Sequence, residues 1–248
     1  MLVGPAKTEI LAIAMLNGGF EILCLLGRGI EQVRIGSDLV WRPTRYVERP
    51  TLEGRHSGLR HGSAAPHDDS SLIAGSNAII IAGCQLLKEV NRLGELRLVI
   101  FTAGRPSYLE AHSPLGLTEG AIMLERFRRG LRDTDFEYLI LGTNRNTRDE
   151  MRETCQAAVS RGLTRVRAVT VSVHVPRTRE FARQACREFP GVSFQVEAAE
   201  DVLCRRYSNR PRCLEDIRTV KCSPCYDRTA ESERRGLEAL RSGHYGFC

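Results

Sequence analysis

The sequence predicts an α/β protein with a Rossmann-like, doubly wound sheet of five mainly parallel strands and helices on both faces. Three observations support this prediction. From residue 72 onward, strand patterns alternate regularly with helix patterns. The strand pattern at 96–102 is apolar on both faces over its central residues, as is typical of a buried parallel strand. The pattern at 192–196 alternates between apolar and polar residues, as a half-exposed edge strand does.

Each expected element has its own signal in the chain. The strands are expected at 9–16, 96–102, 136–141, 165–172 and 192–196. The helices are expected at 71–93 and 118–129, from 147 to Gly162, and from Pro176 to near Gly191. Thr118 is a candidate N-cap, and the spacing of Thr147 and Glu150 is that of a capping box.

The whole chain, 1–248, is expected to form one α/β domain, because its length suffices for one large core and no internal repeat is visible. Two segments do not join the alternation. Residues 20–70 are interpreted as a long insertion at the site, since βα connections usually have about 2–6 residues. Residues 200–248 are interpreted as a cysteine-bearing C-terminal tail that ends in a charged helix at 229–241.

The composition, with 42% hydrophobic and 27% charged residues, is that of a globular protein. No apolar run approaches the ~20 residues of a transmembrane helix, and the run at 10–16 is too short for a secretory signal core. These features predict a cytoplasmic protein without a membrane partner. The net charge of +6 comes mostly from arginines spread along the chain, which argues against nucleic acid. The first interpretation of this charge is a solvated basic surface, and the second is an anionic small-molecule ligand.

The nine cysteines form two groups. Four are expected to be small core residues: Cys24, Cys84, Cys155 and Cys186. The tail contains the other five, Cys204, Cys213, Cys222, Cys225 and Cys248. One Cys-x-x-Cys pair without a second close pair is a weak zinc signal. Metal binding, disulfides and free thiols therefore stay open for the tail.

Polar and flexible residues follow the carboxyl ends of the expected strands, where ligands bind in doubly wound sheets. Glycines let the backbone approach a ligand, and the helix N-termini at Thr147 and Pro176 offer N–H groups to anions. The candidate binding residues are Asn17, Gly18, Gly19, Gly104, Arg105, Glu119, Asn144, Asn146, Thr147, Thr170, Arg177 and Glu197.

His174 is the candidate general acid/base, since the ordinary pKa of histidine is near neutrality. Asp69 is the second candidate catalytic residue, and no metal ligand is assigned. Arg177 lies one helical turn beyond His174, so the two can share an anion, whereas Glu119 and Glu197 are candidates for ribose hydroxyls. Structural alternatives remain, because Asn146, Thr147 and Asp69 can cap helices and a buried histidine can be purely structural.

The order of these motifs resembles that of the YdcF-like family, to which the SanA and ElyC proteins belong. The match covers about 70–197 and the first expected strand, with two departures: Asp149–Glu150 replace a second Asn, and Ser172 is displaced by one residue from a Thr-Ser pair. The resemblance implies a Rossmann-like fold and a nucleotide-like ligand, with S-adenosylmethionine first. The matching positions are Gly18, Gly19, Gly104, Glu119, Asn146, Thr147, Thr170, His174 and Arg177.

The function expected from these observations is that of a small-molecule enzyme of the transferase type that uses S-adenosylmethionine. Two alternatives stay open. The first is a metal-assisted hydrolase or transferase that acts on a phosphorylated or envelope-type substrate without an adenosyl cofactor. The second is a non-catalytic ligand-binding subunit, because the sequence contains no strong nucleophile motif. The substrate, the reaction and the oligomeric state are not assigned by the sequence.

Overall fold

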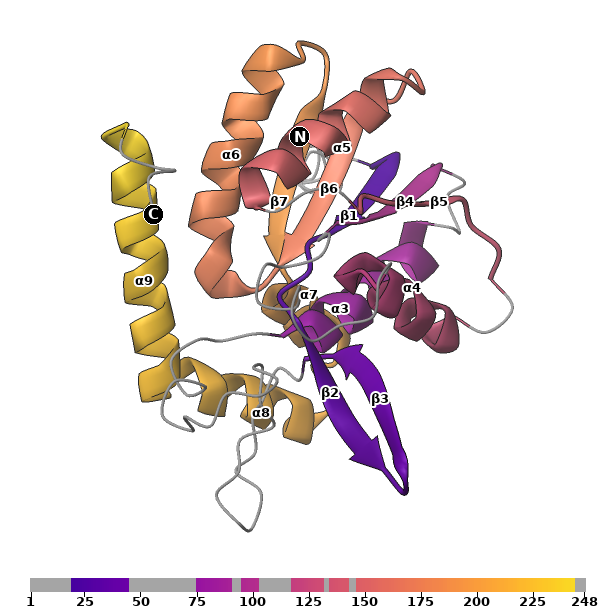
Figure 1. Ribbon diagram of the computed structural model, residues 1–248, viewed down its shortest axis with the longest axis vertical. Coiled ribbons are helices and arrows are strands. Elements are labelled where there is room, and N and C mark those ends of the chain that lie inside the picture. The colour runs from indigo at the N-terminus through magenta and orange to yellow at the C-terminus, as the bar shows by residue number, and fades with distance from the viewer. Residues whose placement is uncertain are drawn as a thin grey trace, which may run out of the picture.

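The computed structural model shows a parallel sheet covered by helices (Figure 1). It describes residues 19–44, 75–90, 95–102, 117–131, 134–142 and 146–243. The strands of the sheet are β1 (Ile22–Leu25), β4 (Leu98–Phe101), β5 (Tyr138–Ile140), β6 (Arg165–Thr170) and β7 (Ser193–Ala198). They lie in the order β5-β4-β1-β6-β7, and every neighbouring pair is parallel. The predicted Rossmann-like sheet is therefore confirmed.

Helices cover both faces of this sheet. The helices are α3 (Ser76–Val90), α4 (Glu119–Gly130), α5 (Thr147–Val159), α6 (Val175–Glu188), α7 (Ala199–Arg206), α8 (Pro211–Lys221) and α9 (Pro224–Arg241). Side chains of β1 alternate between two apolar cores. Leu23 and Leu25 pack with α3, α4 and α7, whereas Ile22 and Cys24 pack with α5 and α6. Because β1 is buried on both faces, it is the centre of the doubly wound sheet.

The sheet has one topological switch point, between β1 and β6. From β1 the chain proceeds outward through β4 to β5, then crosses to the other side of β1 and continues through β6 to β7. In open α/β sheets the connections at such a point leave in opposite directions and open a crevice at the carboxyl ends of the strands. The loop after β1 and the segment after β6 therefore define the expected ligand position.

Two further parts lie beside this edge. A hairpin of β2 (Ile30–Ile35) and β3 (Asp38–Pro43) begins directly after β1 and contacts α4. It extends away from the sheet in Figure 1, at the indigo end of the colour scale. At the other end of the chain, α9 stands beside α6 and contacts the short 3-10 helix η2 (Ser172–His174). The loop and hairpin that follow β1 and the helix α9 thus both lie beside the switch point.

The interpretation of 20–70 as an insertion is wrong for its first part, which contains the central strand and a hairpin. The strand expected at 9–16 lies outside the described residues, and the central strand is β1, inside the segment interpreted as an insertion at 20–70. Residues 22–25 and 30–43 are ordered parts of the fold, whereas 45–70 lie outside the described residues. The segment 200–248, interpreted as a tail, is more helical than the single stretch expected at 229–241, because it contains nearly all of α7 and the whole of α8 and α9.

The remaining elements agree with the predicted patterns within a few residues, and β7 is an edge strand as expected. One cap differs. Asn146 is the N-cap of α5, since its side chain accepts a hydrogen bond of 3.0 Å from the Asp149 N–H, and Thr147 is the first helical residue. Glu150 does not close a capping box; it accepts a 2.8 Å hydrogen bond from Thr102.

None of the helices in the described segments combines the length and the apolar character that crossing a bilayer requires.

Candidate functional site

The loop after β1 brings Arg28 to the switch point. Leu26 still pairs with β6, through a 3.1 Å hydrogen bond from its N–H to the Val169 carbonyl, and the chain then turns away. Gly29 makes this turn with φ of +110°, a conformation that side chains other than glycine rarely adopt. The Arg28 N–H donates to Ser76 Oγ at 2.7 Å, so the start of α3 fixes the loop.

Glu119 holds the same loop from α4. Its carboxylate accepts hydrogen bonds from the Gly29 N–H and from the Ser76 hydroxyl, the latter at 3.0 Å. Its side chain is buried, and burial raises the pKa of Glu119 although both hydrogen bonds oppose this shift. Glu119 is therefore a positioning residue for the Arg28 loop.

His174 lies at the other side of the switch point, where η2 leads into α6. It is 1% exposed. Its Nε2 is 3.0 Å from Thr147 Oγ1, and its Nδ1 is 2.9 Å from Glu233 Oε2. Since an ionised carboxylate only accepts hydrogen bonds, Nδ1 must carry the proton. The Nε2 lone pair then accepts the Thr147 hydroxyl proton, which gives a row of hydroxyl, imidazole and carboxylate.

Glu233 is a carboxylate from α9 around which the cationic groups gather. Arg177, in the first turn of α6, places Nε 2.9 Å from Oε2 and Nη2 3.3 Å from Oε1. Arg28 places Nη2 3.4 Å from Oε1. Two guanidinium groups from opposite sides of the switch point thus share one nearly buried carboxylate. The hydrogen bonds come from Nη2 of each arginine, whereas Arg177 Nε lies close to Oε2 without forming one. Charge-assisted contacts of this kind are those with which arginines hold carboxylates and phosphates.

The surroundings of this cluster shift the pKa values of both His174 and Glu233. Burial and the nearby Arg28 guanidinium lower the pKa of His174 to about 4, against the opposing pull of Glu233. Burial alone would raise the pKa of Glu233, but its contacts with His174, Arg28 and Arg177 lower it well below the usual range. At neutral pH the cluster therefore contains a neutral imidazole, one carboxylate and two guanidinium groups, with a net charge of +1.

Three of the predicted site residues, Thr147, His174 and Arg177, are brought together in this cluster. Thr170 lies at the end of β6; its Oγ1 is buried and has no hydrogen-bond partner among the described residues. Glu119 contributes only through the loop that it holds.

Other predicted residues lie elsewhere. Asn146 is an exposed cap. Glu197 forms an ion pair with Arg205. Gly19 precedes β1 and so lies at the amino edge of the sheet, which contradicts its predicted place after the first strand. Six predicted residues lie outside the described parts of the chain: Asn17, Gly18, Asp69, Gly104, Arg105 and Asn144.

Sequence reasoning missed Arg28 and Glu233. A signal for Arg28 is present, because Gly27-Arg28-Gly29 directly follows the apolar run at 22–26, which is the pattern of a buried strand that ends in a tight loop. No comparable signal exists for Glu233. It lies in a charged helix whose sequence suits a solvated surface, and only the tertiary fold brings it to His174.

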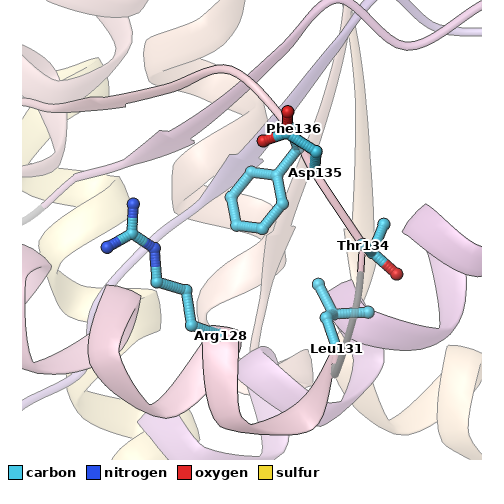
Figure 2. Close-up of a pocket in the computed structure, with 5 residues that line it drawn as sticks. All are labelled: Arg128, Leu131, Thr134, Asp135 and Phe136. Carbon is cyan, nitrogen blue, oxygen red and sulfur yellow. The ribbon is translucent and has the colours of Figure 1, made fainter.

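A separate hollow of about 430 Å³ lies at the opposite edge of the sheet, between the end of α4 and the segment that enters β5. In Figure 2, Arg128 and Leu131 rise from the helix while Asp135 and Phe136 lie on the incoming segment. Arg128 also lies over the Tyr138 ring, 4.6 Å from its centroid. None of the residues that line this hollow belongs to the switch-point cluster.

In the described parts of the chain, no three His, Cys, Asp or Glu side chains lie close enough together to hold a metal ion. Cys204 and Cys222 are free thiols, Cys225 packs against the apolar core, and the side chains of Cys213 and Cys248 lie outside the description. Comparison of the chain with protein-family models, with curated proteins and with solved structures gave no match. The assignment of function therefore depends on the site itself and on the resemblance stated above.

Proposed function

We propose that this protein is a small-molecule enzyme that binds a nucleotide-like ligand at the carboxyl edge of its sheet through an anionic group of that ligand, with S-adenosylmethionine, held by its carboxylate, as the first candidate. One observation carries the proposal. Arg28 and Arg177 approach from the two sides of the switch point and meet at a single carboxylate. This is the position at which doubly wound folds bind nucleotides.

The surrounding groups suit a ligand that combines an anionic group with polar hydroxyls. Thr147 and Arg177 both stand in the first turn of a helix, where the helix dipole favours negative charge. Thr170 offers a buried hydroxyl at the end of β6. S-Adenosylmethionine carries a carboxylate for the two arginines and ribose hydroxyls for neighbouring polar groups.

Of the predicted general acid/base role of His174, this site supports only the part of a base. As a neutral and buried imidazole, His174 does not act as a general acid at neutral pH. It can accept a proton at Nε2, and the group that would supply it is the Thr147 hydroxyl. In the arrangement described here, His174 is a positioning residue for Thr147 and Glu233.

Calorimetric titration tests this proposal. Purified protein is titrated with S-adenosylmethionine, S-adenosylhomocysteine, ATP and AMP, alongside the variants Arg28→Gln and Arg177→Gln. We expect binding of an adenosyl compound to the wild type and a loss of about tenfold or more in each variant, because a charge-assisted contact contributes about 1.5–3 kcal/mol. Arg183→Gln is the matched control, since Arg183 is an exposed α6 residue that pairs with Glu180. Absence of binding by all four compounds would remove the adenosyl ligand.

A second candidate, a hydrolase or transferase without an adenosyl cofactor, is favoured by the row of Thr147, His174 and Glu233. A hydroxyl, a base and an orienting carboxylate in hydrogen-bond contact are the parts of an activated nucleophile. This candidate predicts turnover of phosphorylated or ester substrates that Thr147→Val abolishes, whereas Thr147→Ser retains part of it. Dependence on a divalent metal would favour its metal-assisted form, and ligand binding without any turnover would favour a non-catalytic subunit.

A further inference from the structure

Helix α9 is attached to the rest of the protein in an unusual way. Only two of its 18 residues, Thr229 and Glu233, are buried. Its apolar contacts come from side chains that are only partly buried, including Ala230 and Leu240. Apolar burial normally supplies most of the stability with which a helix docks. The most buried charged contact of α9 is instead the one between Glu233 and the switch-point cluster.

The Glu233 carboxylate is bound as a ligand carboxylate would be. Arg177 donates a hydrogen bond from Nη2 to Oε1, and its Nε lies 2.9 Å from Oε2 as an ion-pair contact without a hydrogen bond. Arg28 reaches Oε1, and the remaining partner is the Nδ1–H of His174 at Oε2. The partners thus lie around a planar, two-oxygen anion. This arrangement suits a carboxylate better than a phosphate, which would present a third oxygen.

We propose that Glu233 occupies the subsite for the carboxylate of the ligand, so that α9 is a built-in competitor which moves aside when a carboxylate-bearing ligand binds. This inference rests on the proposed function, because it takes the switch point as the ligand site. It adds the chemical class of the group that the site accepts. It also implies that α9 keeps the site closed until the ligand is abundant.

Gly236 allows a close contact between α9 and Arg177. A Cβ atom at this position would come within 2.9 Å of Arg177 Nη1, so the glycine lets the α9 backbone lie against the guanidinium group. Glycine is unfavourable inside a helix. A larger residue here would push against the end of the Arg177 side chain, and the clash would be relieved by movement of that side chain or of α9. The substitution Gly236→Leu therefore weakens the contact between α9 and Arg177 without removing a charge.

The test compares wild-type protein with Glu233→Gln, Gly236→Leu and the control Glu231→Gln. Glu231 lies on the same helix, but it pairs only with Arg234 and Arg235 among the described contacts. Each protein is titrated calorimetrically with S-adenosylmethionine, with citrate as a plain carboxylate probe, and with inorganic phosphate. We expect carboxylate affinity about tenfold or more higher in Glu233→Gln and Gly236→Leu than in the wild type and the control, since a closed site reduces apparent affinity by its open fraction.

Hydrogen exchange provides a second measurement that needs no variant. Saturating wild-type protein with the tightest of the three probes should speed amide exchange across α9 and leave α3 unchanged. Equal affinities in all four proteins, a loss of binding in Glu233→Gln, or unchanged exchange in α9 would overturn the proposal. Phosphate affinity that rises more than citrate affinity would overturn the carboxylate assignment.

The two proposals can fail separately. If citrate affinity rises in the opened variants while S-adenosylmethionine binds to none of the proteins, the competitor stands and the adenosyl ligand is wrong. If S-adenosylmethionine binds equally to all four proteins with α9 still protected, the adenosyl ligand stands and the competitor is wrong.

Discussion

His174 shows how one buried residue sets the charge of the whole site. Its imidazole is enclosed between Thr147 and Glu233 and faces the guanidinium groups of Arg28 and Arg177. Burial and Arg28 keep it neutral, so it can both donate to a carboxylate and accept from a hydroxyl. The sequence correctly predicted that His174 and Arg177 lie together, because their spacing of three residues fixes one helical turn. It could not predict burial, which depends on α9.

This burial makes stability depend on pH. The pKa of His174 is about 4 in the folded protein and about 6.5 when the chain is unfolded. Between these values only the unfolded chain binds the proton, so the free energy of unfolding falls as the pH is lowered from 6.5 toward 4. Within this window His174 alone contributes a slope of up to about 1.4 kcal/mol per pH unit.

The variant His174→Asn isolates this effect. Urea unfolding at pH 7.5, 6.5 and 5.5 should show a smaller loss of stability in the variant than in the wild type. The comparison stays above pH 5, because protonation of unfolded carboxylates adds its own loss below that value. Parallel pH dependences in the two proteins would mean that His174 is not held neutral by the fold.

At the scale of elements, the N-terminus of α5 contains one residue that belongs to the switch-point cluster and one that only caps the helix. Thr147 points its hydroxyl at His174, whereas the Asn146 side chain is occupied by the Asp149 N–H. From the sequence alone both residues fit either role, since Asn and Thr cap helices and also bind ligands.

Asn146→Ala therefore has a specific expected result. Loss of the cap should lower the free energy of unfolding by about 0.5–2 kcal/mol without changing ligand affinity. Asn146→Ser, which keeps a capping oxygen, should recover most of the stability. Chemical unfolding measures the first quantity and calorimetric titration the second. A drop in affinity in the serine variant, at normal stability, would return Asn146 to the binding residues predicted from sequence.

Strand β1 is the element that the sequence analysis did not predict. Strand β1 has only four residues and is buried on both faces, so it shows neither the alternation of an edge strand nor a helical period. The apolar run at 9–16 has the same character and comes first in the chain. The central place of β1 is fixed by its pairing with both β4 and β6, which is a property of the assembled sheet.

At the scale of the whole molecule, the order of the strands determines the site. Alternating patterns were enough to predict a parallel, doubly wound sheet and hence a ligand at its carboxyl edge. They could not identify which two strand ends flank the switch point, because that requires the strand order. Once β1 and β6 are known to be neighbours, Arg28 and His174 lie together, although 146 positions separate them in the chain.

The central claim is that this switch point is an anion-binding site, and a crystal structure of protein soaked with S-adenosylmethionine and citrate tests it most directly. We predict density for a carboxylate in contact with the guanidinium groups of both Arg28 and Arg177, between the ends of β1 and β6. Ligand bound instead in the hollow lined by Leu131 and Phe136 (Figure 2), with Arg28 and Arg177 still engaged by Glu233 alone, would contradict it.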